Sequence, residues 1–205
     1  MEIELKYSLK SASQIDEILG DEQIKAITDE GSLEVFPISS EYFDTEDLRL
    51  THERVAFRVR KEGRRYIATV KWNGHSESGM HEREENNVPV SEKEMSDPTV
   101  EIFRQSSMYE RLKQLIGGRK LSVLMTTDFE RRQVRLDSGN VICEMSFDTG
   151  SVCCGGRTAP ICEMEIELYS GSREEMEKIG DYVSEKYGLE PENKSKFGRG
   201  LELKK

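Results

Sequence analysis

Long apolar runs are missing from this chain of 205 residues. No stretch approaches the ~20 apolar residues that a membrane-spanning helix needs, and no basic segment followed by an apolar one marks the start as an export signal. Positive charge is also scarce, because 30 lysines and arginines face 40 acidic residues and leave a net charge of −10. Such a charge disfavours a general affinity for nucleic acids or anionic membranes. We therefore expect neither a nucleic-acid partner nor a membrane partner.

Cysteine spacings typical of a metal knuckle or a disulfide framework are absent too. The four cysteines lie in the last third of the chain: Cys143, Cys153, Cys154 and Cys162. Cys153 and Cys154 are adjacent, whereas a zinc knuckle needs two residues between its paired cysteines. We therefore interpret the four side chains as reduced thiols and expect the protein in the cytoplasm.

What the chain does contain is strands with one charged face and one apolar face. Charged residues make up 34% of the sequence and hydrophobic residues 35%, which fits one globular domain with a real core. The first eight residues alternate strictly, so that Glu2, Glu4 and Lys6 fall on one side of a strand and Ile3 and Leu5 on the other. Taken alone, this pattern is typical of an ordinary strand with one side in water.

The same alternation returns near the end of the chain, and there it gives more specific information. Residues 161–168 place Glu163, Glu165 and Glu167 on one face, opposite apolar side chains. Between the two acidic strands, the expected strand over residues 55–60 carries Arg58 and Arg60 on its polar face. The polar faces of other expected strands carry Lys71, Arg83, Glu85, Arg131, Glu144 and Asp148. The charged faces are therefore sorted into acidic and basic strands.

Periodicity and turn residues predict the other elements. We expect helices over residues 11–20, 100–116 and 173–187, the last one ended by Gly188. Further strands are expected over residues 24–28, 32–36, 64–72, 79–90, 121–136 and 141–148, with hairpin turns at 73–74 and 137–140. The three histidines are expected at the surface or in loops: His52, His75 and His81.

One architecture accommodates both the sorted strands and the amphipathic helices. In an α+β, mainly β fold, a closed antiparallel barrel has a polar lumen, no open sheet edge, and apolar outer faces that helices cover. Carboxylates two residues apart on a strand lie about 6–7 Å from each other, so two acidic strands could offer several oxygens to one Mg²⁺ or Mn²⁺ ion. The alternative is that the charges only pair with one another as salt bridges in the lumen.

These residues resemble the CYTH domain, the family of triphosphate tunnel metalloenzymes. The resemblance starts with Glu2-x-Glu4-x-Lys6 and covers essentially the whole chain. His81-x-Arg83 and residues 160–163 are most similar to the bacterial inorganic triphosphatase branch. We expect residues 1–205 to be a single domain of this kind, without the helical CHAD domain that many members of the branch carry. The other matching pieces are residues 42–45, Arg58-x-Arg60, residues 69–71, Arg83-x-Glu85, Glu144 with Asp148, Glu163-x-Glu165-x-Glu167, and Ser195-Lys196.

The resemblance implies an eight-stranded antiparallel tunnel and a role for each charged position. The implied metal ligands are Glu2, Glu4, Glu163, Glu165 and Glu167. The implied phosphate-binding residues are Lys6, Arg58, Arg60, Lys71, Arg83, Arg131 and Lys196. Lys6, Arg58, Arg60 and Lys71 among them are also expected to be catalytic, with Glu85, Glu144 and Asp148 in support. Two positions depart from the family pattern: Phe129 replaces a frequent lysine, and Cys153-Cys154 stands where a basic residue is common.

The function that the resemblance implies is the metal-dependent hydrolysis of a small-molecule triphosphate. Inorganic triphosphate would give pyrophosphate and phosphate, with Mg²⁺ or Mn²⁺ as the cofactor and basic side chains stabilising the displaced charge. Three alternatives stay open: an adenylate cyclase of class IV, a nucleoside or thiamine triphosphatase, and a non-enzymatic module that binds polyphosphate. The sequence indicates neither the oligomeric state nor the preferred metal.

Overall fold

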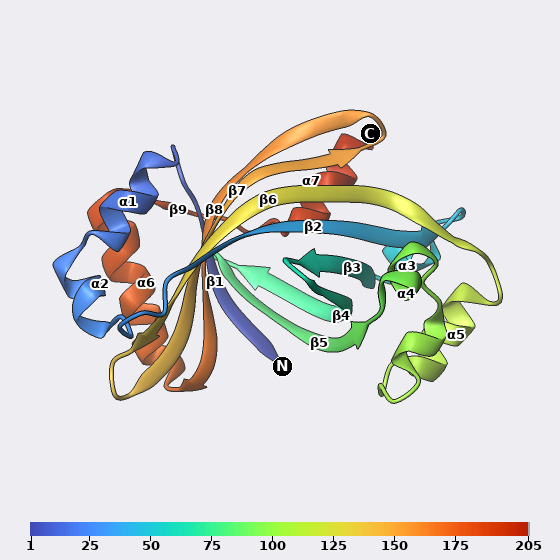
Figure 1. The fold of residues 1–205 in the computed structure, drawn as a ribbon, viewed down its shortest axis with the longest axis horizontal. Coiled ribbons are helices and arrows are strands. Elements are labelled where there is room, and N and C mark those ends of the chain that lie inside the picture. Colours follow the sequence, from blue (N-terminus) through green and yellow to red (C-terminus); the bar gives the residue numbers. More distant parts are fainter. Residues whose placement is uncertain (205) are drawn as a thin grey trace.

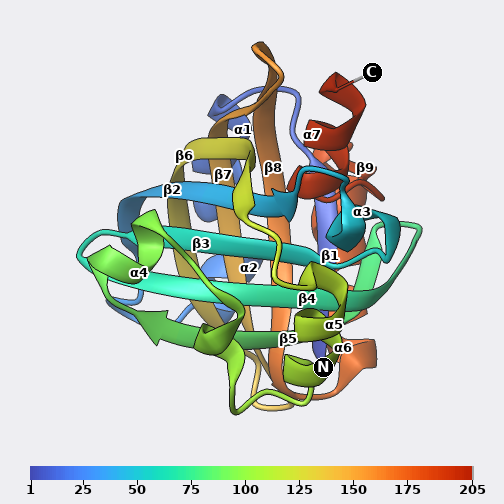
Figure 2. The ribbon, with the colours of Figure 1, turned by 90° about the vertical axis from the view of Figure 1, so that its right-hand side faces the viewer.

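Eight antiparallel strands close into a barrel in this computed structural model, which describes residues 1–204. The strands follow the order β5-β4-β3-β2-β6-β7-β8-β1, and pairing of β1 with β5 closes the ring (Figures 1 and 2). The expected fold class is therefore confirmed. A two-residue strand, β9 (Glu190–Pro191), pairs with β1. The barrel strands are β1 (Glu2–Ser8), β2 (Glu34–Thr45), β3 (Ala56–Glu62), β4 (Arg65–Glu77), β5 (Met80–Val90), β6 (Leu121–Asp137), β7 (Val141–Cys154) and β8 (Arg157–Gly171).

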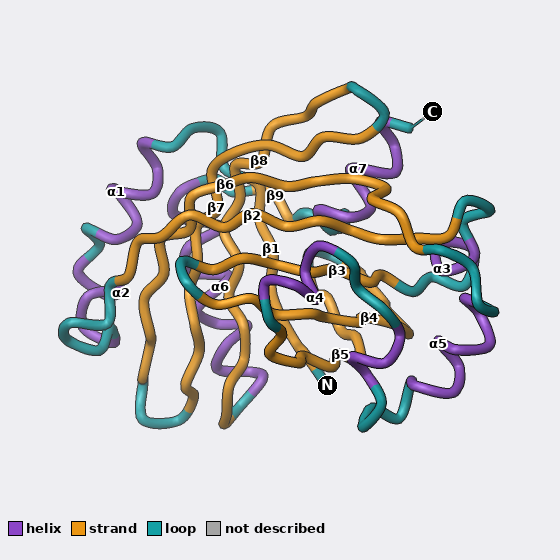
Figure 3. The backbone as a smooth tube through the Cα atoms, turned by 45° about the vertical axis from the view of Figure 1, so that its right-hand side comes forward, coloured by secondary structure: helices purple, strands orange, loops and turns teal. Residues whose placement is uncertain are grey.

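Helices gather at opposite ends of the barrel, with the strands between them (Figure 3). At one end, α1 (Ser13–Leu19), α2 (Glu22–Ile27) and α6 (Arg173–Tyr187) share an apolar cluster with the outward side chains of β1, β7 and β8. Gly180 of α6 lies so close to β1 that an added Cβ would sit 2.5 Å from the hydroxyl of Tyr7. The absence of a side chain there allows α6 to pack directly on the strand that carries Glu2, Glu4 and Lys6.

The other end of the barrel has its own apolar cluster. There α3 (Arg49–His52), the short 3₁₀ helix η1 (Val100–Phe103) and α5 (Tyr109–Ile116) cover the outward side chains of β3 and β4, such as Phe57. A further helix, α4 (Glu92–Ser96), begins with a capping box formed by Ser91 and Glu94. Over residues 1–204, no helix is both long enough and apolar enough to cross a membrane.

The last helix, α7 (Lys196–Leu203), differs from the others because it packs on the lumen side of the sheet. Its Phe197 and Leu201 join a third apolar cluster with Met125, Val152 and Ile161 on β6, β7 and β8. Tyr42 lines the central cavity and is the register partner of Met125, so this cluster faces inward. Helix α7 therefore lies against the inside of the barrel.

Two of the local predictions are wrong. Residues 24–28 belong mostly to α2 rather than to a strand, because the Asp21 carboxylate accepts hydrogen bonds from the amides of Gln23 and Ile24 and caps a helix. The Asn73-Gly74 pair does not reverse the chain. It forms an irregularity within β4, where Asn73 has a φ of 52° and the pairing register with β5 shifts. The chain reverses later, at Ser78 and Gly79.

Other predictions are confirmed with small changes in their bounds. Helix α6 matches its expected range, and Gly188 ends it with a φ of 61°. The turn over residues 137–140 joins β6 to β7 as expected. The polar and apolar faces also separate as predicted: Leu5, Phe57 and Ile166 are buried outside the lumen, in the two clusters under the helices.

Candidate functional site

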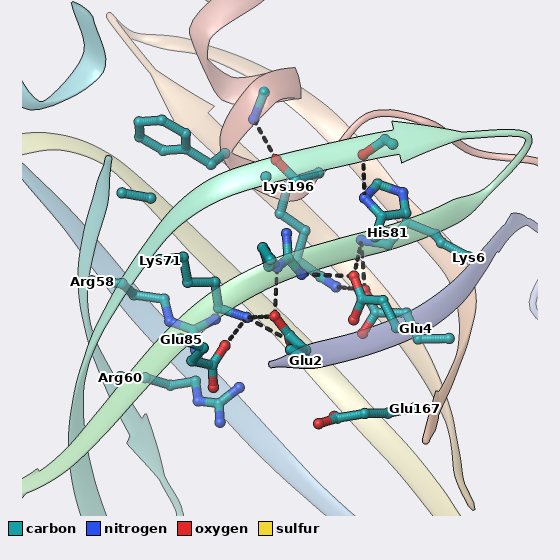
Figure 4. A pocket seen from close by; sticks show the side chains of 18 of the residues that line it. Glu2, Glu4, Lys6, Arg58, Arg60, Lys71, His81, Glu85, Glu167 and Lys196 are labelled. Atoms are coloured by element: carbon teal, nitrogen blue, oxygen red, sulfur yellow. Dashed lines mark hydrogen bonds and ion pairs between the residues drawn. The ribbon is translucent and has the colours of Figure 1, made fainter. Parts of the chain in front are cut away.

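The lumen contains a cavity of about 660 Å³ whose wall is mostly charged (Figure 4). Its lining comes from inward positions of the strands and from the segment that leads into α7. Asp148 and Glu163 are absent from the lining, because both are fully buried behind it and contact Lys196. The structure brings these predicted residues together around the cavity: Glu2, Glu4, Lys6, Arg58, Arg60, Lys71, Arg83, Glu85, Arg131, Glu144, Glu165, Glu167 and Lys196.

One acidic group, Asp148, Glu163 and Glu165, is neutralised by basic side chains. Oxygen atoms of these three residues lie within 4.8 Å of one another, which is close enough for a shared metal ion. Basic side chains already bind them, however. The Lys6 ammonium lies 2.6 Å from Glu165, and the Lys196 ammonium lies 2.6 Å from Asp148 and 3.0 Å from Glu165.

Two arginines complete this neutralised group. The Arg131 guanidinium donates two hydrogen bonds of 2.7 Å to Asp148 and one of 2.9 Å to Glu165, and Arg199 forms an ion pair with Glu163. Burial alone would raise the pKa of Glu165, but the neighbouring Lys196, Lys6 and Arg131 hold it well below its usual range. Glu165 is therefore ionised, and protein cations already compensate the charge of this acidic group.

A second acidic group, Glu2, Glu4 and Glu167, is only partly compensated. Glu2 accepts hydrogen bonds of 2.8 Å from Lys71 and 2.5 Å from Arg83, which also binds Glu4 at 2.7 Å. Glu167 is the β8 register partner of Glu4, yet no ion pair joins it to any residue within 1–204. Figure 4 accordingly draws dashed lines from Glu2 but none from Glu167.

The surroundings of Glu167 disfavour its ionised form. Burial, together with the negative charges of Glu2 and Glu4, raises the pKa of Glu167 to about 8. A proton holds this carboxyl group neutral over much of the physiological range. A divalent cation bound between the three residues would replace that proton and compensate their charge.

On β3, Arg58 and Arg60 form a basic wall of the cavity, where positive charge is only partly compensated. Arg58 makes a hydrogen bond of 3.3 Å to the hydroxyl of Thr69, and Arg60 pairs with Glu62. Among the described residues, no hydrogen-bond partner is found for the buried Nε atoms of Arg58 and Arg60. Burial and the like charges of Arg58 and Arg131 lower the pKa of Arg60 to about 10. This wall therefore favours an anionic ligand.

The CYTH domain model matches residues 1–201. The chain belongs to the CYTH family. An inorganic triphosphatase from Haemophilus influenzae is 32% identical over 139 residues, which cover 68% of this chain and 38% of that protein. The chain therefore matches less than half the length of this curated relative.

Solved structures of CYTH-like architecture agree with the fold over almost the whole chain. The Hippeastrum protein HpAC1, described as having a dominant triphosphatase activity, superposes with a TM-score of 0.70 at 19% identity, covering 99% of this chain and 96% of its own. The PH1819 protein from Pyrococcus horikoshii OT3 superposes with a TM-score of 0.60 at 19% identity, covering 99% of each chain. At this level of identity, the similarity shows a shared fold.

The prediction for His81 is wrong, although those for His52 and His75 hold, since both are exposed. His81 is only 2% exposed and lines the CYTH cavity. Its ring nitrogens lie 2.8 Å from the Ser76 hydroxyl and 2.7 Å from the carbonyl oxygen of Glu192. Its register could have shown this position, because it alternates with Arg83 and Glu85 on the inward face of β5.

Sequence reasoning also missed the role of Arg199, which no alternation marks because it lies on a helix. The two departures from the family pattern have clear positions. The Phe129 ring lies under two cations, with its centroid 5.0 Å from the Lys196 ammonium and 5.9 Å from the Arg131 guanidinium. Cys154 is buried beside α7, where its thiol donates to the Leu124 carbonyl at 3.4 Å. As expected, the four cysteines are free thiols.

Proposed function

We propose that this CYTH chain hydrolyses a phosphoanhydride bond of a triphosphate with the help of a divalent metal ion, and that inorganic triphosphate is its substrate. One observation carries the proposal: a single cavity holds a carboxyl group without an ion-pair partner among the described residues, Glu167, and two arginines whose buried Nε atoms have no hydrogen-bond partner there, Arg58 and Arg60. A triphosphate with its metal ion carries both charges needed to compensate them. The inorganic triphosphatase that is 32% identical supports this choice of substrate.

The metal would bind to Glu2, Glu4 and Glu167. Their carboxylate oxygens are the donors that Mg²⁺ and Mn²⁺ prefer, and Glu167 forms no ion pair with any described residue. The resemblance also implied Glu163 and Glu165 as ligands, but Lys6, Lys196 and Arg199 already bind these two carboxylates. We therefore restrict the proposed ligand set to the first group. When bound, the ion would supply charge neutralisation at the phosphate oxygens.

The basic residues would bind and stabilise the reacting phosphates. Arg58 and Arg60 present guanidinium groups, whose planar donors match phosphate oxygens, and Arg131 is held beside them by Asp148. Hydrolysis moves negative charge onto the leaving oxygen, and cations fixed in advance stabilise that movement without reorganisation. Water is the nucleophile in this scheme, so no serine or cysteine is needed.

The neutralised acidic group keeps two lysines charged in a buried place. Burial by itself would lower the pKa values of Lys6 and Lys196, but Glu163 and Glu165 raise both, together with Glu4 for Lys6 and with Asp148 for Lys196. Ion pairs with Glu85 and Glu2 position the Lys71 ammonium. Glu144 accepts a hydrogen bond of 2.7 Å from the Tyr169 hydroxyl, and its charge helps to raise the pKa of Arg131.

An organic triphosphate is the second candidate substrate. The cavity wall contains Phe36 and Tyr169 beside the charged residues, and aromatic side chains of this kind could pack against a base or a thiazolium ring. The volume of about 660 Å³ lies within the range of sites for small ligands. Nucleoside and thiamine triphosphates therefore belong in any substrate test.

A substrate panel tests the proposal. Purified protein is incubated with inorganic triphosphate, ATP and thiamine triphosphate in Mg²⁺ or Mn²⁺, and orthophosphate, pyrophosphate and cyclic AMP are measured separately. Hydrolysis of inorganic triphosphate predicts equal amounts of orthophosphate and pyrophosphate. Cyclic AMP and pyrophosphate from ATP, without turnover of inorganic triphosphate, would instead identify a cyclase, and binding without any product would identify a binding module.

A further inference from the structure

The segment after α6 carries two of the lumen cations into the barrel. Strand β9 pairs with Tyr7 and Ser8 of β1, and the Glu192 amide then donates to the Lys6 carbonyl at 2.9 Å. Ser195 caps the following helix by accepting a hydrogen bond of 3.0 Å from the Gly198 amide. Helix α7 then directs Lys196 and Arg199 to the buried carboxylates (Figure 4 shows Lys196). We call residues 190–195 the tail.

His81 ties this tail to the hairpin between β4 and β5. Because the Glu192 carbonyl oxygen can only accept a hydrogen bond, the Nε2 atom of His81 carries a proton, and in the neutral ring Nδ1 then accepts from the Ser76 hydroxyl. A second tie lies next to it, where the Gly79 amide donates to the Asn193 side chain at 2.7 Å. Gly79 has a φ of +79°, and a Cβ there would lie 2.9 Å from Pro191, so hairpin and tail are closely packed.

The position of the tail decides the charge balance at one end of the lumen. With α7 in place, four carboxylates (Glu4, Asp148, Glu163, Glu165) face four cations (Lys6, Arg131, Lys196, Arg199) and the charges balance, because the Lys6 ammonium also lies 3.8 Å from Glu4. Without the two cations of α7, the same carboxylates would face two cations and leave two negative charges in excess. An anion would be repelled in the second state but not in the first.

We propose that His81 is a positioning residue, which holds the tail against the hairpin and so keeps Lys196 and Arg199 inside the lumen. His81 need not touch the substrate, because it acts through these two side chains. The consequence for triphosphate affinity rests on the proposed function, whereas the consequence for the position of α7 does not.

Three variants separate this role from a general contribution to stability. His81→Ala removes both hydrogen bonds, His81→Gln keeps a donor for the Glu192 carbonyl, and Ser76→Ala removes only the bond that does not reach the tail. Inorganic triphosphate is titrated in EDTA by calorimetry, so that no turnover follows. We expect binding to weaken about five- to tenfold in His81→Ala, the scale of one lost hydrogen bond, and to change less than twofold in the other two.

A double-mutant cycle then tests whether His81 acts through Lys196. Lys196→Met keeps most of the apolar stem and removes the charge. In the Lys196→Met background, His81→Ala should weaken triphosphate binding by a smaller factor than in the unmodified protein, because the Lys196 charge that His81 positions is already absent. Equal factors in both backgrounds would overturn the proposal.

Hydrogen exchange gives a readout that does not depend on triphosphate. Amides of residues 196–203 should exchange at least about fivefold faster in His81→Ala than in the unmodified protein and in His81→Gln, while those of α6 keep their rate. Equal rates over residues 196–203 in all three proteins, or an equal acceleration of α6, would overturn the proposal. If the unmodified protein binds no triphosphate, the proposed function fails, while hydrogen exchange still decides the role of His81.

Discussion

Glu165 and Glu167 occupy neighbouring inward positions of β8, yet replacing each by glutamine should have opposite effects. The substitution keeps the side-chain volume and removes one negative charge in both cases. Glu165 lies within 3.0 Å of Lys6, Lys196 and Arg131, whereas no ion pair joins Glu167 to any described residue. The two variants therefore serve as matched controls for each other.

The expected loss for Glu165→Gln follows from its three ion pairs. Removing one partner of a buried charge network leaves the other charges uncompensated and typically costs about 3–5 kcal/mol. The side chain is only 11% exposed, so solvent screens little of this effect. Glu165→Gln should therefore lower the free energy of unfolding at neutral pH by about that amount.

Glu167→Gln should instead stabilise the metal-free protein at high pH. The folded-state pKa of about 8 lies above the ordinary value of 4.5, so the folded state binds the proton more tightly than the unfolded state. Stability must then fall as the pH rises from about 4.5 to about 8, by roughly 1.4 kcal/mol for each unit of the shift at most. Glutamine removes this pH dependence, so the free energy of unfolding of the variant should increase relative to that of the unmodified protein as the pH rises.

Urea unfolding in EDTA at pH 5, 7 and 9 measures both effects, and calorimetric titration with Mn²⁺ measures the metal affinity. If Glu167 is a ligand, Glu167→Gln should weaken Mn²⁺ binding by at least about tenfold, and Glu165→Gln by less. A Glu167→Gln protein that is less stable than the unmodified protein at pH 9, or that binds Mn²⁺ equally well, would refute the assignment of charges in the lumen.

Two further substitutions separate function from folding. Arg58→Ala should lower kcat/KM by at least about 10²-fold, the scale of one lost electrostatic stabiliser. The melting temperature should stay nearly unchanged, because Arg58 lies outside the apolar clusters. A much lower melting temperature with normal activity per folded molecule would instead show a structural role. Asp44→Ala should instead lower the stability of the fold, because this carboxylate accepts hydrogen bonds from the Leu50 amide at 3.0 Å and the Thr51 amide at 2.9 Å. We expect a loss of about 1–3 kcal/mol in urea unfolding, and an unchanged unfolding midpoint would contradict that role.

The barrel could be predicted from the sequence because strict alternation is a local signal. Glu2, Glu4 and Lys6 face the lumen as predicted, and so do Arg58 and Arg60. Each inward position follows from its strand alone, and the sorting of acidic and basic strands then indicates a lumen with both signs of charge.

The partners of these charges could not be predicted in the same way. Glu165 and Glu167 look alike in the sequence, but Glu165 meets Lys196, which lies 31 positions later and reaches it only because α7 packs inside the barrel. The inward position of His81 could have been predicted from its register, but its partner, a backbone carbonyl of the tail, could not. The turn predicted at Asn73-Gly74 was wrong because this residue pair is compatible with a bulge inside a strand as well as with a hairpin turn.

The most direct test of the proposed activity is a time course of the unmodified protein with inorganic triphosphate, followed by ³¹P NMR. In Mg²⁺, the triphosphate signals should decrease while orthophosphate and pyrophosphate increase in equal amounts. Excess EDTA should stop the reaction, and added Mg²⁺ should restart it. Triphosphate that stays intact in Mg²⁺ and in Mn²⁺, or that is cleaved equally fast in EDTA, would contradict a metal-dependent triphosphatase.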